Sequence, residues 1–306
     1  MKLILNPTPL VTLFFVALLV FGSCKKETSA DTAEEEFALQ ASSEADAESD
    51  DIFNEVFDNV MGVNADVAFG GTGVFGQMNS GTVGETARLT ACPDVTITHL
   101  STTSIFPVKI VMDFGTGCTG RDGRSRSGKI ITEYTSRLMV PGAKATTTFE
   151  NYAVDSIKIQ GTHIITNQSD ISSTNCMTHK WKVVVENAKL IKPNGNYVEW
   201  NSTRTIVQGE GMCTPFIPLD DIYKIEGSSN GKVKRGNLLI AWKSETAEPL
   251  VKKFSCRWLV KGVIRIIRQN LATNSPWVAT INYGLGDCDN KALATINGVT
   301  HIITLP

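Results

Sequence analysis

The sequence predicts an all-β protein whose long antiparallel strands and hairpins form a sandwich or an extended sheet. Three observations predict this class. After residue 67, β-branched and aromatic residues form the apolar runs, and Gly, Asn, Asp and Ser interrupt these runs at short intervals. Three Asn-Gly dipeptides also stand between runs, and this pair favours type I′ hairpin turns because both residues tolerate a positive φ. No stretch after residue 67 has a convincing helical period. We therefore expect residues 67–306 to form a β-rich domain.

Residues 1–23 are interpreted as a lipoprotein signal peptide. A basic start precedes an apolar run over residues 10–21, which is shorter than the roughly 20 residues of a membrane-spanning helix. The following Gly22-Ser23-Cys24 resembles the lipobox of bacterial lipoproteins, in which the cysteine is alkylated with diacylglycerol and acylated, commonly with palmitate. Phe21 departs from that pattern, because leucine is commoner at this position.

The resemblance implies that Cys24 is the lipid attachment site and holds the protein on a membrane. Lys25 follows, so the aspartate that retains some lipoproteins at the inner membrane is absent. We therefore expect an outer-membrane location, on the periplasmic side or exposed at the surface. An ordinary secretory signal that contains a cysteine is the alternative.

Residues 24–66 are predicted to be an acidic tether. Thirteen acidic residues and no Lys or Arg lie between Glu27 and Asp66. Such composition predicts a disordered, self-repelling chain, with an acidic calcium-binding tract as the alternative. Near its end, apolar residues recur at helical spacing, so we expect a short amphipathic helix at about 51–61 that docks on the β-rich domain.

The acidic tether conceals a basic domain. The chain has 29 basic and 31 acidic residues, but residues 67–306 contain 26 of the basic and 18 of the acidic ones, giving about +8. A surplus of this size favours either simple solubility or binding of polyanions such as lipopolysaccharide phosphates.

Fourteen segments are expected to be strands. They cover 85–91, 94–100, 106–114, 128–139, 145–152, 156–167, 180–191, 197–207, 222–227, 232–243, 255–268, 277–283, 291–296 and 299–305. Asn194-Gly195, Asn230-Gly231 and Asn297-Gly298 are expected to be hairpin turns between them. Residues 111–118 resemble residues 280–288, since each has an aromatic residue, Gly-x-Gly and then a cysteine. We interpret this similarity as two pseudo-repeats, with coincidence as the alternative.

Setting Cys24 aside leaves six cysteines, an even number that favours disulfides in an exported protein. Six cysteines allow fifteen connectivities. Sequential pairing is the simplest, because the spacing within the first and last pairs is similar. The predicted disulfides are Cys92–Cys118, Cys176–Cys213 and Cys256–Cys288. A zinc site is the alternative, but no Cys-x-x-Cys or His-x₃-His spacing occurs.

Catalytic motifs are not found, and no cofactor or metal is expected. His99, His163, His179 and His301 are far apart, and neither His-Glu-x-x-His nor Gly-x-Ser-x-Gly occurs. Asp220-Asp221 and Asp287-x-Asp289 could supply a glycosidase pair or a calcium site, and the five tryptophans could stack on sugar. Aromatic residues on strands more often pack in the core.

Residues 123–130 nearly match a phosphate-binding loop, but Ile130 replaces the hydroxyl residue and a strand follows instead of a helix. We interpret this segment as a basic, flexible β-turn. It concentrates positive charge, so it is the best candidate for anion contact, through Arg121, Arg124, Arg126 and Lys129.

The lipobox, the acidic spacer and Asp113-Phe-Gly-Thr-Gly-Cys118 with its basic turn together resemble β-rich envelope lipoproteins of Gram-negative bacteria. The resemblance implies a location and no activity. Our leading hypothesis is a non-enzymatic binding or structural module, with a glycan or an envelope protein as partner and no nucleic acid. The alternatives are a secreted hydrolase of glycans or esters whose site assembles only in three dimensions, and a polyanion-binding domain.

Overall fold

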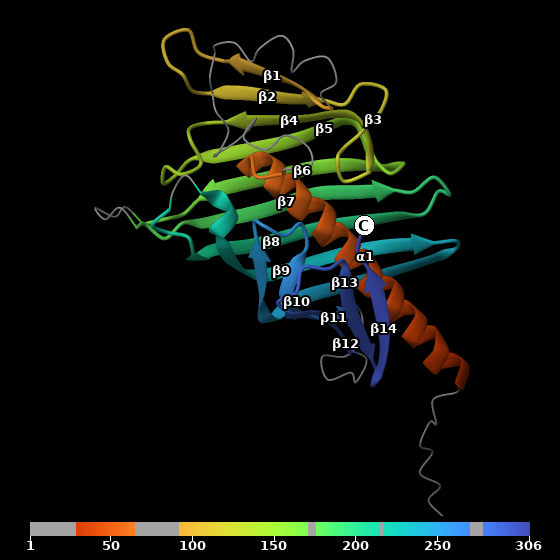
Figure 1. Ribbon diagram of the computed structural model, residues 1–306. Coiled ribbons are helices and arrows are strands. Elements are labelled where there is room, and N and C mark those ends of the chain that lie inside the picture. Colours follow the sequence, from red (N-terminus) through yellow and green to blue (C-terminus); the bar gives the residue numbers. More distant parts are fainter. Residues whose placement is uncertain (1–28, 65–91, 171–175, 215–216, 270–277) are drawn as a thin grey trace, which may run out of the picture.

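The computed structural model describes residues 29–64, 92–170, 176–214, 217–269 and 278–306. Within these residues the chain forms one antiparallel sheet of fourteen strands and one long helix (Figure 1). The strands pair in chain order, except that β3 pairs only with β4. The predicted all-β class is confirmed, in the form of an extended sheet.

The bounds of the elements are as follows: α1 Ser29–Met61, β1 Asp94–His99, β2 Val108–Asp113, β3 Cys118–Thr119, β4 Ser125–Tyr134, β5 Lys144–Val154, β6 Ile157–Asn167, β7 Lys180–Ile191, β8 Tyr197–Glu210, a 3₁₀ turn Pro218–Asp220, β9 Ile222–Arg235, β10 Leu238–Lys253, β11 Leu259–Arg268, β12 Val278–Leu285, β13 Lys291–Ile296 and β14 Val299–Thr304. The strand expected at 85–91 lies outside the described residues.

Two of the three predicted Asn-Gly hairpins are confirmed. Asn297 and Gly298 both have positive φ, 50° and 82°, and join β13 to β14 as a two-residue turn. The turn at Asn194-Gly195 joins β7 to β8, but only Gly195 is left-handed, and its N–H donates to the carbonyl of Lys192. The hairpin was therefore predicted correctly and its type I′ conformation was not.

The third hairpin prediction is wrong, because Asn230 and Gly231 lie inside the continuous strand β9. The turn comes five residues later, after Arg235, where β9 meets β10. A Cβ atom on Gly231 would lie 2.6 Å from the Trp242 ring and from the Glu199 carbonyl oxygen. Glycine is needed here because a tryptophan packs against the strand backbone, so it does not mark a turn.

All three predicted disulfides are confirmed. Cys92 pairs with Cys118 near β2 and β3, and Cys176 pairs with Cys213. Cys256–Cys288 links the β10–β11 connection to the segment after β12. The paired cysteines exclude the zinc alternative at these positions, and each bond closes a loop of 26 to 37 residues, worth about 3–4 kcal/mol in the chain-entropy model.

The predicted disordered tether is wrong from Ser29 onward, because α1 is a helix of 33 residues. The expected helix at 51–61 is only its last third, and the expected docking on the sheet is confirmed. Nearly every side chain from Ala38 to Met61 is buried. The helix is therefore part of the protein core, and the acidic composition has a structural use.

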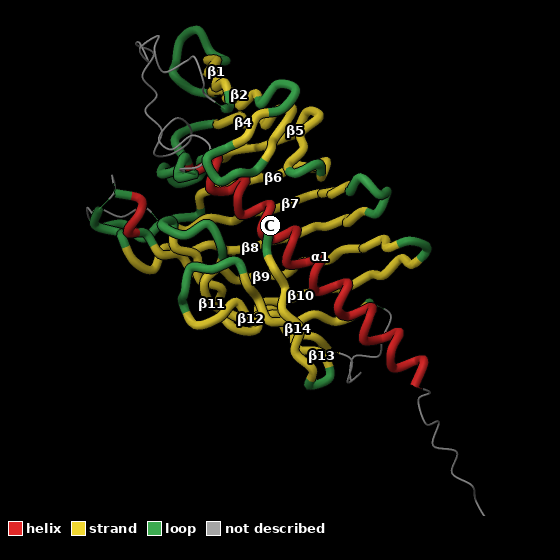
Figure 2. The backbone as a smooth tube through the Cα atoms, turned by 45° about the vertical axis from the view of Figure 1, so that its right-hand side comes forward, coloured by secondary structure: helices red, strands yellow, loops and turns green. Residues whose placement is uncertain are grey.

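The sheet curls around α1, which lies along its concave side (Figures 1 and 2). Aromatic side chains fill the contact: Phe53 stacks on Trp200 with ring centroids 5.6 Å apart, and Phe57 meets Trp181 edge-on. The Tyr134 hydroxyl donates to the carbonyl oxygen of Val60 and so satisfies a group in the last turn of the helix.

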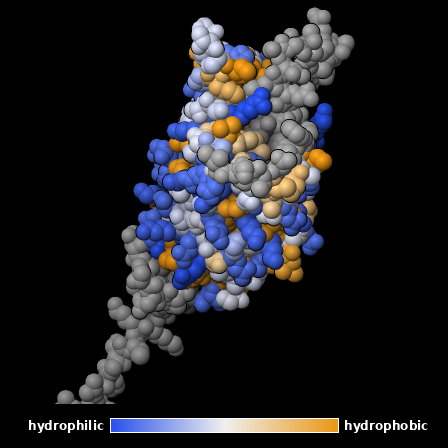
Figure 3. All heavy atoms as spheres, turned by 90° about the vertical axis from the view of Figure 1, so that its left-hand side faces the viewer, coloured by the Kyte–Doolittle hydropathy of each residue, from blue (hydrophilic) through white to orange (hydrophobic). Residues whose placement is uncertain are grey.

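Side chains alternate along the strands between this buried side and the outside, as β8 shows from Tyr197 to Gln208. On the face turned to the viewer in Figure 3, hydrophilic residues predominate and apolar ones are scattered. The buried apolar side chains thus gather between helix and sheet, and the face shown in Figure 3 is largely polar.

Candidate functional site

The ionisable chemistry of the described residues gathers between α1 and the sheet. The helix carries eleven acidic residues and no basic one. Five of these acidic side chains are buried, namely Asp46, Asp50, Asp51, Glu55 and Asp58. Buried carboxylates are costly unless they are paired and hydrogen-bonded, so their partners define the site.

Glu55 is the centre of an arginine cluster. Its carboxylate accepts hydrogen bonds from Arg124 Nη1 at 2.8 Å and from Arg126 Nη2 at 2.6 Å, and Arg257 Nη2 lies 3.5 Å away. Asp122 forms a second ion pair with Arg126 at 2.6 Å. Arg126 is only 1% exposed, so the pairs lie in the core. This network joins the start of β4 and the β10–β11 connection to one turn of the helix.

The predicted anion contact at residues 121–129 is therefore corrected. Arg124 and Arg126 are buried and bind carboxylates of the chain itself, and Lys129 pairs with Asp113 at 3.2 Å. Of the four, Arg121 is exposed and Lys129 is partly exposed. The segment expected to be a flexible turn also enters β4 at Ser125. The carboxylates that Arg124 and Arg126 bind are Glu55 of α1 together with Asp155 and Asp122 of the sheet region.

Asp46 is held by three adjacent strands. Its Oδ1 accepts hydrogen bonds from Trp200 Nε1 at 2.9 Å, Trp242 Nε1 at 3.0 Å and Ser229 Oγ at 2.5 Å. The tryptophans considered for sugar stacking thus serve in part as buried donors to the helix. No sequence signal identified this arrangement, because the donors lie more than 150 positions from the aspartate.

The remaining buried carboxylates have single basic partners. Asp50 lies 3.3 Å from Arg204, and Asp58 lies 2.8 Å from Lys252. Asp51 has a longer ion pair, with its Oδ2 atom 3.8 Å from Arg257 Nη2. Burial raises the pKa of all three groups, to about 7 for Asp51 and to about 6 for Asp58, while the basic neighbours oppose the rise.

A row of small polar residues crosses the sheet beneath the helix. Cross-strand pairing places them in register from β4 to β10, with Val185 in the same row. The polar members are Thr132, Thr147, His163, Ser202, Ser229 and Ser244, all buried. Two of them contact the helix directly: the His163 ring stacks on Phe53, and Ser229 Oγ donates to Asp46. Both ring nitrogens of His163 lack a hydrogen-bond partner, and burial lowers its pKa to about 3.

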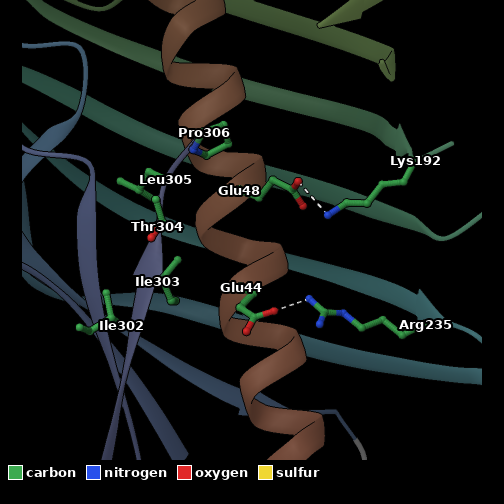
Figure 4. Close-up of a pocket in the computed structure, with 9 residues that line it drawn as sticks. All are labelled: Glu44, Glu48, Lys192, Arg235, Ile302, Ile303, Thr304, Leu305 and Pro306. Atoms are coloured by element: carbon green, nitrogen blue, oxygen red, sulfur yellow. Dashed lines mark hydrogen bonds and ion pairs between the residues drawn. The ribbon is translucent and has the colours of Figure 1, made fainter. Parts of the chain in front are cut away.

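An open pocket of about 200 Å³ lies over the less buried side of α1 (Figure 4). Glu48 pairs with Lys192 at 2.9 Å, and Glu44 pairs with Arg235 at 2.5 Å. In Figure 4 both carboxylates point toward these bases, and residues 302–306 lie on the other side of the helix. The two acidic and two basic side chains thus form two ion pairs at the pocket.

The carboxylates proposed for catalysis have structural partners. Asp221 Oδ1 accepts a hydrogen bond from Gln208 at 2.8 Å, and Oδ2 accepts one from the Tyr223 hydroxyl at 2.7 Å. Burial raises the pKa of Asp221 to about 6. Asp220 accepts a hydrogen bond from Thr214 instead, and Asp289 accepts one from the backbone N–H of Lys291. The structure does not join these side chains into one catalytic pair.

The described part of the chain contains neither a metal-binding cluster nor a membrane-spanning helix. No group of three or more His, Cys, Asp or Glu side chains among them is placed to hold a metal ion. Among the described helices, none has the length and apolar character needed to cross a membrane. Cys24 and the rest of the expected signal peptide lie outside the described residues, as does Trp277.

Comparison with family models, curated proteins and solved structures found no match to this chain. The class that the fold itself defines is a disulfide-linked, in-order antiparallel sheet folded around an acidic helix.

Proposed function

We propose that this protein is an envelope lipoprotein, anchored to the outer membrane through Cys24, whose curled sheet serves as a non-enzymatic binding or structural module. The observation that carries the proposal is the position of α1. The helix begins at Ser29, five residues after Cys24, and most of its length is buried in the core. A lipid on Cys24 would thus lie five residues from a helix that is packed in the core of the sheet.

The disulfides support export. Three bonds spread over the sheet are typical of proteins that fold in an oxidising compartment such as the bacterial periplasm. The buried network supports a non-enzymatic role, because residues such as Glu55 and Arg126 bind each other and are not presented to a substrate. Recognition would then take place on the outer surface of the sheet and at its hairpin ends.

Metabolic labelling with an alkyne palmitate analogue in a Gram-negative host tests the anchor. We expect label on the natural chain and on the control Ser23→Ala, because alanine is also small enough for the position before the cysteine. We expect no label on Cys24→Ala, and recovery of that variant in the soluble envelope fraction. Label that persists on Cys24→Ala, or an unlabelled natural chain, would refute the proposed anchor.

A hydrolase is the second candidate, and one observation favours it. The raised pKa of Asp221 lies near the range in which a carboxyl group works as a general acid. However, its side chain is 4% exposed and both its oxygens already accept hydrogen bonds. Hydrolysis of glycans or esters by the purified chain, abolished by Asp221→Asn without loss of folding, would favour this candidate over a binding module.

A further inference from the structure

The end of the β9–β10 hairpin exposes two adjacent leucines. Leu238 is 43% exposed and Leu239 is 59% exposed, directly after the turn at Gly236-Asn237. Neighbouring residues on a strand point to opposite faces, so each face of the hairpin end carries one leucine. A hairpin end that exposes a leucine on both faces matches an environment that surrounds it, unlike a protein partner that covers one face.

Basic residues lie directly across the hairpin from the leucines. In the strand register Leu239 lies opposite Lys234, and Leu238 lies opposite Arg235. Arg235 is paired with Glu44, but Lys232 and Lys234 have no ion pair within the described part of the chain.

Next to these lysines, the Tyr197 ring lies 5.9 Å from the Lys234 Nζ and 4.2 Å from the Lys189 Nζ. Leucines, basic residues and Tyr197 thus lie at the same level of the hairpin end. Long basic side chains can reach the headgroups while neighbouring apolar side chains enter the membrane interface.

The start of α1 and this hairpin end lie on the same side of the molecule in both ribbon views (Figures 1 and 2). The Glu44–Arg235 pair fixes the hairpin beside the helix, fifteen residues or about 22 Å along the axis from Ser29. The five residues back to Cys24 can span at most about 18 Å. A lipid on Cys24 therefore keeps this side of the molecule near the bilayer.

We propose that the β9–β10 hairpin end is a membrane-docking surface that inserts Leu238 and Leu239 into the interface of a bilayer containing anionic phospholipid. The inference rests on the proposed anchor at Cys24 and adds an orientation to it. The leucines lie within two residues of the turn, about 7 Å, which matches the roughly 5–10 Å depth of interfacial insertion. Lys232 and Lys234 then face the headgroups.

The acidic first turns of α1 limit the strength of this contact. Glu34, Glu35 and Glu36 lie near the start of the helix, and only Glu35 has a basic partner among the described residues, Arg268 at 2.5 Å. Their repulsion from anionic lipid opposes the attraction of the lysines. The hairpin therefore sets the orientation of the protein on the membrane, while the lipid supplies most of the attachment.

Vesicle flotation with the exported chain carrying Cys24→Ala separates docking from lipidation. We expect binding to vesicles of phosphatidylethanolamine and phosphatidylglycerol, weaker binding in high salt, and much weaker binding when phosphatidylcholine replaces phosphatidylglycerol. Replacing both leucines (Leu238→Ser with Leu239→Ser) should lower partitioning roughly tenfold or more, because their apolar area no longer leaves water.

Leu285→Ser is the matched control for this experiment. Leu285 is 89% exposed and pairs with Lys261, at the opposite end of β11 from Arg268. Its replacement should leave binding unchanged, and an equal urea midpoint for all variants would show that they fold. Equal binding of the two-leucine variant, or absence of binding by the unlipidated chain, would overturn the docking surface.

Palmitate labelling of the same two-leucine variant, made in a chain that keeps Cys24, distinguishes the docking surface from the lipid anchor. Label with no hairpin effect on vesicles refutes the docking surface and leaves the anchor intact. Hairpin-dependent vesicle binding without label on Cys24 supports the surface and refutes the anchor. Leu239→Trp adds a direct readout, since its emission should shift to the blue on vesicles while that of Leu285→Trp should not.

Discussion

Replacing Glu55 by glutamine should test whether α1 is a core element. The Glu55 carboxylate is buried and faces Arg124, Arg126 and Arg257, with its two shortest contacts at 2.6 and 2.8 Å. Glu55→Gln removes the negative charge and directs an NH₂ group at a guanidinium donor. Breaking a buried ion pair by removing one partner costs about 3–5 kcal/mol.

The remaining acidic residues reduce this loss. Arg126 keeps Asp122 at 2.6 Å, and Arg124 keeps Asp155 at 2.8 Å. We therefore expect Glu55→Gln to lower the free energy of unfolding by about 3 kcal/mol, at the lower end of that range.

Urea denaturation at neutral pH, followed by tryptophan fluorescence, measures the effect because Trp181, Trp200 and Trp242 are buried around the helix. Glu44→Gln is the matched control: it is on the same helix and also pairs with an arginine, but both side chains are 32% exposed. Glu44→Gln should lower the free energy of unfolding by less than about 1 kcal/mol. If the two variants lose similar, small amounts of stability, the buried network is not formed and α1 is not in the core.

Two further changes probe the interior. Burial raises the pKa of Asp51 to about 7, so the folded state binds this proton more tightly than the unfolded chain does. The contribution of Asp51 to the free energy of unfolding therefore falls as pH rises from about 4 through about 7. The pKa of His163 is lowered to about 3, so below its ordinary pKa this group makes the folded state less stable as pH falls. Both the natural chain and Asp51→Asn contain His163, so the difference between their free energies of unfolding isolates the effect of Asp51. We expect that difference to change by on the order of 2–4 kcal/mol in urea titrations between pH 4 and 8, and a pH-independent difference would contradict it. Gly231→Ala should lower the thermal midpoint and cost about 2 kcal/mol, because its Cβ would lie 2.6 Å from the Trp242 ring. Gly209→Ala, where the nearest backbone atom is at 3.5 Å, is the control, and equal midpoints for the two alanine variants would count against the packing.

Local patterns in the sequence predicted the sheet well. Strands such as β7 and β8 have both the residue types and the turn that join them, so their pairing is determined by neighbours in sequence. The disulfides were also predictable, because the six cysteines pair sequentially: the first with the second, the third with the fourth and the fifth with the sixth. The error at Asn230-Gly231 arose because a glycine required by the Trp242 ring looks the same in sequence as a glycine required by a turn.

The helix could not be predicted in the same way. Its acidic residues indicated disorder because their partners, such as Arg126 and Trp242, lie 71 and 196 positions away. Composition offered one signal that could have found the arrangement: an acidic segment without any Lys or Arg precedes a domain of about +8. Opposite charges on two parts of one chain predict that the parts can bind each other, but they do not identify which residues pair.

The depth at which α1 is held has a consequence for the order of folding. The helix comes before the sheet in the chain, yet it contacts β8 to β13. The hydrogen bond of Asp46 to Trp242, for example, cannot form until β10 is in place. Contacts between such distant positions are slow to form, because the loop entropy is lost before the contact contributes. During folding, the first element of the described chain should therefore be the last to pack in its final place. Until then, its carboxylates remain solvated and unpaired with the sheet.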